Sequence, residues 1–268
     1  MAGDTKLNLL GVLVDAVDYG AAVEAIIAAA RRPRPFGVSA LAVHGVMTGA
    51  LNATHRYRLN HLELVVPDGQ PVRWGLNLLH GAGLRDRVYG PNLMLRVCEQ
   101  AAQEALPVFL YGSRPEVLAA LEQRLRGRFP SLVVAGSRPS AFRRLDPDET
   151  RRVVEEVRGS GARLCFAGLG CPRQEVWAYE MRERLGMPVL AVGAAFDFHA
   201  GLLSQAPERL ARLGLEWLYR LSREPRRLWR RYLLLNPLYL TLLAAQWLHL
   251  RRFDPERCTP PQHELRYG

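Results

Sequence analysis

The stretch "PVFLYGSRPEVLAALEQRLRGRF", residues 107–129, contains a change of periodicity. A short apolar run over 107–112 ends at Gly112 and Ser113, and the residues from Pro115 onward place apolar side chains at helical spacing. Proline is well suited to a first helical turn. The pattern therefore predicts a buried strand, a tight turn and an amphipathic helix, which is the repeating unit of a parallel sheet covered by helices.

The same alternation recurs along most of the chain. Strands are predicted over 7–15, 37–43, 61–66, 107–112, 131–136, 162–168 and 188–194. Helices are predicted over 19–32, 92–105, 114–129 and 146–161. The predicted fold class is α/β, with a mainly parallel sheet and helices on both of its faces. Ligands of such sheets bind at the carboxyl ends of the strands, so the residues that follow each strand are the candidate site.

Two of the predicted strands end in glycine and lead into a helix. Gly112 lies in "FLYGSRPE" and Gly170 in "FAGLGCPRQE". Free backbone amides at a helix start attract phosphates and carboxylates, which makes both turns candidate substrate-binding segments. Neither stretch has the GxGxxG spacing of a dinucleotide site, and a plain strand-to-helix turn explains both equally well.

The stretch "VVPDGQP", residues 65–71, places an acid directly after a buried apolar run. Asp-Gly is ordinary turn chemistry, because aspartate bonds to nearby amides and glycine tolerates positive φ. Asp68 is also at the predicted carboxyl end of a strand, and Gly69 leaves room beside it. The local sequence favours the turn and leaves a catalytic carboxylate open.

Composition favours anionic partners. The chain of 268 residues has 49% hydrophobic and 23% charged residues, which suits a globular core, and its formal net charge is +10. Lys6 is the only lysine, so nearly all of this charge is arginine, whose forked donors suit phosphate. The four cysteines lie far apart without the spacing of a zinc site, and the N-terminus lacks a signal-peptide pattern, so a cytoplasmic location is expected.

The character of the sequence changes after residue 203. Residues 205–232 contain eight arginines and three glutamates, and Pro225 is expected to end one helix and begin another. The uncharged stretch 232–250 has the minimum length of a membrane span, but polar residues interrupt it and arginines flank it. An interfacial helix fits best, ahead of a helix buried in the fold or a subunit contact, and a true span fits least. The predicted domains are an α/β core over 1–203 and a basic helical appendage over 204–268.

Four stretches resemble the WecG/TagA/CpsF family of bacterial glycosyltransferases (glycosyltransferase family 26), over roughly residues 8–235. They are "VVPDG" (65–69), "FAGLGCPRQE" (166–175), "VGAAFDFHAGLLSQAP" (192–207) and "LGLEWLYRLSREPRRLWRRY" (213–232). The resemblance implies a Rossmann-like core and a peripheral membrane enzyme of cell-surface polysaccharide synthesis. It implies inverting transfer from a UDP-sugar, often of the N-acetylmannosamine type, to a polyprenyl-diphosphate-linked amino sugar. It also implies that no metal and no other cofactor is needed.

Residue roles follow from the same resemblance. It implies that Asp68 is the general base and that Gln174 lines the donor pocket. Three appendage arginines are implied to reach the diphosphate: Arg220, Arg227 and Arg230. The sequence departs from the family where Ala40 and Ala42 replace the usual Thr-x-Asn pair, and Ser39 and His44 are the nearest polar residues that could compensate. This departure leaves the sugar specificity open.

Two other classes of function stay open at this point. A nucleotide-binding oxidoreductase would use the same type of sheet, although the dinucleotide motif is absent. A non-enzymatic protein could bind a membrane surface through the basic helices. Nucleic acid is not an expected partner, because no nucleic-acid-binding motif is present. A homo-oligomer is considered, and the oligomeric state is left open.

Overall fold

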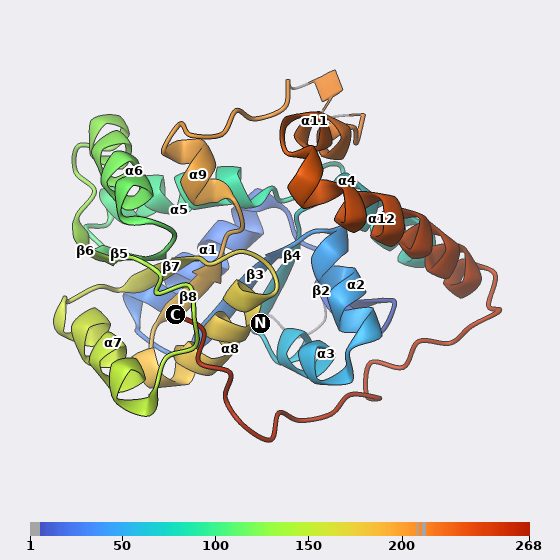
Figure 1. Ribbon diagram of the computed structural model, residues 1–268, viewed down its shortest axis with the longest axis horizontal. Helices are drawn as coiled ribbons and strands as arrows, with labels where there is room; N and C mark the ends of the chain where they lie inside the picture. Colours follow the sequence, from blue (N-terminus) through green and yellow to red (C-terminus); the bar gives the residue numbers. More distant parts are fainter. Residues whose placement is uncertain (1–5, 208, 211–212) are drawn as a thin grey trace.

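The computed structural model describes residues 6–207, 209–210 and 213–268, without the side chains of residues 227, 230 and 231. A six-stranded sheet with the order β4-β3-β8-β7-β5-β6 forms its centre (Figure 1). Its strands are β3 (Phe36–Leu41), β4 (Leu64–Pro67), β5 (Val108–Gly112), β6 (Val134–Arg138), β7 (Leu164–Gly168) and β8 (Pro188–Ala191). Every neighbouring pair in this sheet is parallel. The predicted α/β, Rossmann-like class is confirmed.

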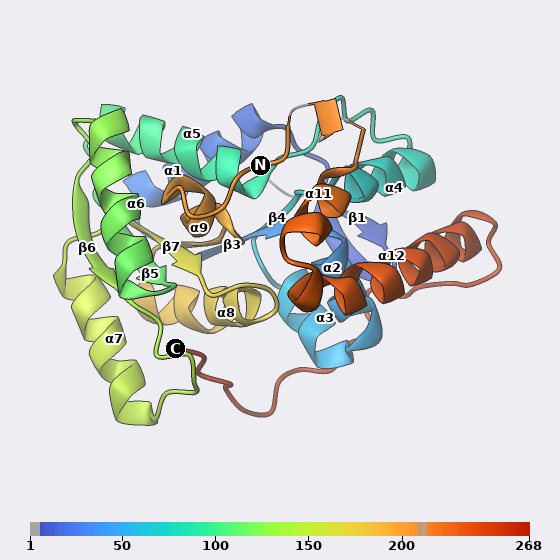
Figure 2. The ribbon, with the colours of Figure 1, turned by 45° about the horizontal axis from the view of Figure 1, so that its top comes forward.

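Helices cover both faces of the sheet (Figure 2). One face is covered by α1 (Tyr19–Arg31), α5 (Gly90–Gln103), α6 (Pro115–Arg128) and α9 (Ala195–His199). The other is covered by α2 (Val43–Leu51), α3 (Ala53–Asn60), α4 (Gln70–His80), α7 (Pro147–Gly159) and α8 (Arg173–Leu185). Strand side chains alternate between the two cores, so Leu110 packs into the first and Tyr111 into the second. The Tyr111 ring stacks on Trp177 of α8, with ring centroids 4.3 Å apart.

The prediction of one strand over 7–15 is wrong. The segment forms an antiparallel hairpin of β1 (Lys6–Leu9) and β2 (Val12–Asp15), apart from the main sheet. Leu10 and Gly11 turn the chain with φ of 56° and 86°, and the apolar run hid this turn because Leu10 is itself buried. The Asp15 carboxylate accepts a hydrogen bond from Val65 N at 2.8 Å, which fixes the hairpin beside β4.

The C-terminal region forms the two helices that the sequence predicts. They are α11 (Glu216–Arg223) and α12 (Pro225–Trp247), and the second helix begins at Pro225 as expected. The hydroxyl of Tyr239 in α12 donates to the Pro71 carbonyl at 2.7 Å. Gln246 accepts from Leu10 N at 2.9 Å, so α12 is attached to both α4 and the hairpin.

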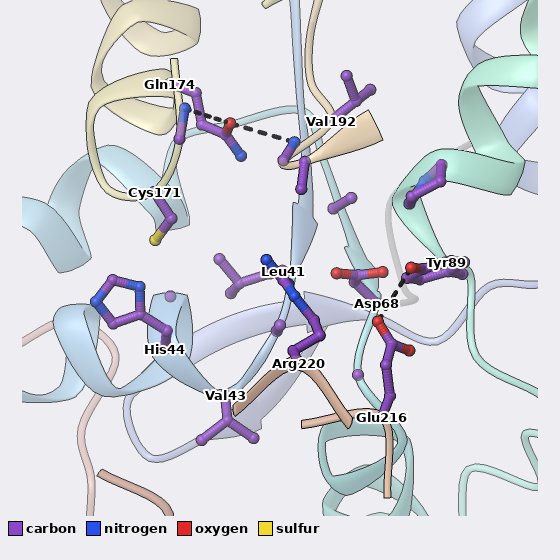
Figure 3. Close-up of a pocket in the computed structure, with 18 of the residues that line it drawn as sticks. Leu41, Val43, His44, Asp68, Tyr89, Cys171, Gln174, Val192, Glu216 and Arg220 are labelled. Carbon is purple, nitrogen blue, oxygen red and sulfur yellow. Dashed lines mark hydrogen bonds between the residues drawn. The ribbon is translucent and has the colours of Figure 1, made fainter. Parts of the chain in front are cut away.

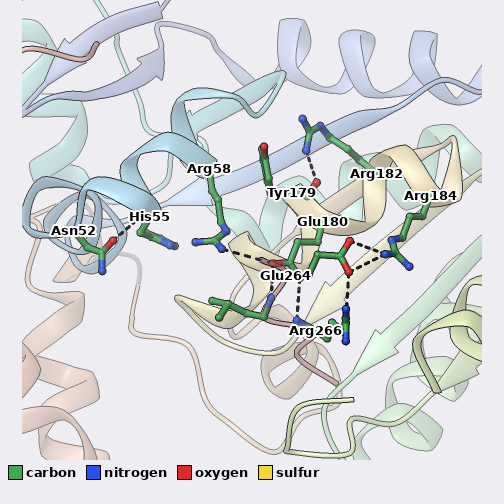
Figure 4. A network of polar contacts seen from close by, with 10 residues as sticks. Asn52, His55, Arg58, Tyr179, Glu180, Arg182, Arg184, Glu264 and Arg266 are labelled. Atoms are coloured by element: carbon green, nitrogen blue, oxygen red, sulfur yellow. Dashed lines mark hydrogen bonds and ion pairs between the residues drawn. The ribbon is translucent and has the colours of Figure 1, made fainter. Parts of the chain in front are cut away.

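The chain beyond α12 returns across the core (Figure 1). Glu180 of α8 accepts hydrogen bonds from Leu265 N and Arg266 N at 2.8 and 3.0 Å, and Arg184 pairs with Glu264 at 2.6 Å (Figure 4). The last residues of the appendage sequence therefore contact the α/β core. The boundary at residues 203 and 204 stays a prediction.

Several large apolar side chains of α12 are exposed. They include Trp229, Leu233, Leu234, Leu240 and Trp247. Within the described ranges, no helix combines the length and the apolar character that crossing a bilayer requires.

Candidate active site

A cavity of about 420 Å³ opens at the carboxyl ends of the parallel strands. Its core wall consists of residues 42–45 after β3, 68–71 after β4, 113–114 after β5, 168–171 after β7 and 192–194 after β8. The opposite wall comes from α11 and α12, through Glu216, Trp217, Arg220 and Tyr232. Five strand ends and the appendage thus meet at one site. This is where the parallel sheet predicts a ligand.

Asp68 lies at the base of this cavity, directly after β4 (Figure 3). Its backbone N donates to the Leu41 carbonyl at 3.2 Å, and its Oδ1 accepts from Gly90 N at 2.8 Å. Burial raises the pKa of its carboxyl to about 6, although Arg87 and the Gly90 amide oppose the shift. Asp68 is therefore mostly ionised at neutral pH and more basic than an ordinary carboxylate, which suits a proton acceptor.

The start of α5 holds the Asp68 carboxylate. Gly90 is the first residue of this helix, and its amide is the one that reaches Asp68. A Cβ on Gly90 would lie 2.9 Å from the Val192 carbonyl oxygen and 3.1 Å from the Ala40 Cβ. Glycine thus lets the helix start approach the sheet closely enough to bond the carboxylate.

Gln174 joins two loops of the cavity. Its side-chain oxygen accepts from Gly170 N at 3.1 Å and from Gly193 N at 3.2 Å (Figure 3). Its amide nitrogen donates to Glu175 at 3.0 Å, and the side chain is buried. Gln174 therefore holds the loop after β7 and the loop after β8 next to each other. Its side chain also lines the cavity.

Several helices begin at the cavity without a side-chain cap, among them α2, α4, α6 and α8. By contrast, α1, α3 and α7, which begin outside the cavity lining, are capped by Asp18, Asn52 and Asp146. An uncapped helix start leaves amide groups and a partial positive charge for an anion. The cavity combines this feature with a guanidinium group, because Arg220 extends from α11 into it (Figure 3).

A search of protein-family models supplies the family. The model described as "Glycosyl transferase WecG/TagA/CpsF family" matches residues 7–253. The chain belongs to this family. It is a glycosyltransferase of cell-surface polysaccharide synthesis, which uses a nucleotide-sugar donor and an acceptor substrate.

The site of this glycosyltransferase brings together most of the candidate residues. Those that line the cavity are Asp68, Gly69, His44, Gly170, Gln174 and Arg220. Among the described residues, Ser39 and Gly112 do not reach the cavity wall. Ser39 is buried within β3, and Gly112 lies where β5 approaches β7, so closely that a Cβ would be 2.9 Å from Gly168 backbone atoms. The side chains of Arg227 and Arg230 lie outside the described part of the chain.

The cavity residues that the sequence did not point to include Arg87, Tyr89 and Glu216. Arg87 pairs with Glu216 at 2.6 Å, and the Tyr89 hydroxyl donates to Glu216 at 3.0 Å. One signal was available, because Glu216 is an acid among the arginines of the appendage. His44, in contrast, is the one polar candidate beside Ala40 and Ala42 that does line the cavity.

No group of three or more His, Cys, Asp or Glu side chains among the described residues is arranged to hold a metal ion. The positive groups of the cavity wall are Arg87, Arg114 and Arg220, together with the helix starts. These groups could bind the diphosphate of a nucleotide sugar.

Proposed function

We propose that this glycosyltransferase transfers a sugar, of the N-acetylmannosamine type or a related hexose, from a UDP-sugar to a polyprenyl-diphosphate-linked amino sugar, with inversion. The acceptor hydroxyl oxygen attacks the anomeric carbon and forms the new glycosidic bond. Its proton passes to the Asp68 carboxylate. The bond between the anomeric carbon and the diphosphate oxygen breaks, and UDP leaves with the electron pair.

One observation carries the proposal: an ionisable carboxylate with a pKa raised to about 6 lies in the same cavity as a guanidinium group. Asp68 comes from the core and Arg220 from the appendage, so a sugar bound between them meets a base on one side and a positive charge on the other. Stabilising charge as it develops on a leaving group is commonly the largest single contribution to catalysis. The uncapped starts of α6 and α8 supply further positive potential next to the loops after β5 and β7.

The decisive experiment measures UDP release. We would incubate the purified full-length protein with a polyprenyl-diphosphate-linked amino sugar and each of a panel of UDP-sugars. The mass of the lipid product is then determined by mass spectrometry. We expect one or a few UDP-sugars to give UDP and a product heavier by one sugar, with the rate unchanged by EDTA. The absence of turnover with every UDP-sugar would exclude this donor class, and a strong loss with EDTA would contradict the arginine-based mechanism.

We also propose that the enzyme acts at a membrane surface, with the exposed apolar side chains of α12 entering the interface. A lipid-linked acceptor requires such contact, and the flanking arginines add attraction to anionic lipid. Vesicles containing anionic phospholipid should bind the wild-type protein and bind a Leu233→Glu, Leu240→Glu variant much more weakly. Equal binding of both proteins would exclude this face of α12.

A further inference from the structure

Helix α11 has a single ionic attachment to the core among the described residues, and it lies at the active site. Glu216 is the first residue of the helix, and its carboxylate pairs with Arg87 at 2.6 Å and accepts from the Tyr89 hydroxyl at 3.0 Å. The side chains of Glu216 and Arg87 are only 13% and 11% exposed. None of the described side chains of α11 is fully buried. The Trp217 ring contacts Tyr232 of α12, and the Arg220 guanidinium lies over the Phe198 ring, 5.6 Å from its centroid. Glu216 adds the ion pair that joins the helix to the core.

The segment that receives Glu216 is the one that holds Asp68. Gly90 N donates to the Asp68 carboxylate at 2.8 Å. Tyr89 N donates to the Tyr19 hydroxyl at 2.9 Å, which fixes the backbone at this residue. Val88 N is bonded to the Pro67 carbonyl at 2.9 Å. Residues 87–90 thus connect the appendage to Asp68 through fixed hydrogen bonds.

Glu216 and Arg220 are neighbours on the surface of α11. The two residues are four positions apart, which places them on the same face of α11. On an isolated helix such a pair would bond to each other. Here the Glu216 carboxylate is occupied by Arg87 and Tyr89, and the Arg220 side chain extends into the middle of the cavity (Figure 3).

We propose that Glu216 is a positioning residue, which clamps α11 to residues 87–90 and thereby sets Arg220 opposite Asp68. This inference rests on the proposed function for the roles of Arg220 and Asp68. The clamp itself is a structural claim about α11, so it can be tested without any substrate.

The first test is hydrogen–deuterium exchange of the full-length protein, with Glu216→Gln compared with wild type. Glutamine keeps the shape of the side chain and removes its charge. We expect the amides of 216–223 to exchange about tenfold faster in the variant, with α7 unchanged. Glu256→Gln is the matched control, because Glu256 is an exposed carboxylate of the appendage sequence outside the cavity lining, and it should leave exchange in α11 unaltered. Unchanged protection of 216–223 in Glu216→Gln would overturn the clamp.

The second test is kinetic and uses a double-mutant cycle. Misplacing a catalytic group by about 1 Å can cost about 10²-fold in rate, so Glu216→Gln should lower kcat by up to that factor. If Glu216 acts by placing Arg220, the same substitution in an Arg220→Ala background should change kcat by less than about twofold. Full additivity of the two losses would show that Glu216 does not act through Arg220.

A pH profile tests whether Glu216 lies close enough to the core for its charge to act on Asp68. The groups that bear on Asp68 are Arg87, Tyr89, Glu216, Arg220 and Tyr19. Without the Glu216 charge, Arg87 faces Asp68 alone, whereas Arg220 is the weakest of the influences on its pKa. The acid limb of kcat/KM should therefore move to lower pH in Glu216→Gln. An unmoved midpoint would contradict the proposal, whereas a wild-type protein that releases no UDP would remove the proposed function and leave the exchange test intact.

Discussion

The two walls of the cavity are built in different ways. On the core wall, polar groups are fixed by backbone hydrogen bonds: Asp68 by the Gly90 amide, and Gln174 by the amides of Gly170 and Gly193. On the appendage wall, α11 has no fully buried side chain among those described, and its ionic contact with the core passes through Glu216. The core wall therefore offers fixed geometry, whereas the appendage wall offers positive charge on a helix without a fully buried side chain.

This difference matches two different chemical demands. A proton acceptor must lie within hydrogen-bond distance of the attacking hydroxyl, so a small displacement removes its effect. A charge that stabilises a departing diphosphate acts over a longer range than a proton transfer, although it too must be placed correctly to have its full effect. We therefore expect substitutions on the core wall to cost more activity than those on the appendage wall.

The largest effect is expected for Asp68→Asn. The amide keeps the shape of the side chain and can still accept from Gly90 N, but it cannot take a proton. The rate of UDP release should fall by about 10³-fold. Asp86→Asn is the control, since Asp86 is an exposed acid in the loop between α4 and α5 and lies outside the cavity lining. A wild-type rate in Asp68→Asn would show that Asp68 is not the proton acceptor. It would also contradict the expectation that substitutions on the core wall cost more activity than those on the appendage wall.

Arg220→Ala tests the appendage wall and should cost about 10²-fold in kcat, since one stabilising donor for the leaving group is lost. Arg223→Ala, on the same helix but outside the cavity lining, should stay close to wild type. Equal losses in the two variants would indicate that the appendage supplies only general positive charge. A loss larger than that of Asp68→Asn would reverse the ranking of the two walls.

The core wall could largely be predicted from the sequence. Apolar runs mark the strands, and the residues just after them are the ones that line the cavity, which is why Asp68 and Gly170 were found. The role of Gln174 was less accessible, because its oxygen accepts from amides of two different loops, Gly170 before α8 and Gly193 after β8. The prediction that Ser39 lines the site is wrong, because alternation along β3 buries its side chain between the sheet and the helices of the α8 face.

The appendage wall could not be assembled from the sequence in the same way. The contacts of Glu216 with Arg87 and Tyr89 join residues more than a hundred positions apart, and nothing local to either segment indicates the pairing. The hairpin at Leu10 was hidden for a related reason, since the buried side chain at the turn continues the apolar run. Long-range ionic contacts and buried turns are decided by tertiary packing, which periodicity does not report.

The pH dependence sharpens the comparison, because both walls act on the same carboxyl. Burial raises the pKa of Asp68 to about 6, so kcat/KM should rise with pH through about 6 and then level off. Below that value it should fall about tenfold per pH unit, since only the ionised form accepts a proton. Arg220 lowers this pKa, so Arg220→Ala should move the midpoint upward. A flat profile between pH 5 and 7, estimated as roughly one unit on either side of the midpoint, would show that no group with this pKa limits the rate.

The smallest effect is expected from Tyr239→Phe, which tests how α12 is attached rather than the chemistry. The variant loses the hydrogen bond from the buried hydroxyl to the Pro71 carbonyl, at 2.7 Å, and should lower the free energy of unfolding by about 1 kcal/mol. Thr241→Val is the control, because its exposed hydroxyl bonds only to the Pro237 carbonyl of its own helix, and its effect should stay within about 0.5 kcal/mol. Urea unfolding measures both. Because Tyr239 supports α12 from the side of α4, kcat should change little, and a large loss of kcat in Tyr239→Phe would mean that the appendage wall depends on α12 as much as on Glu216.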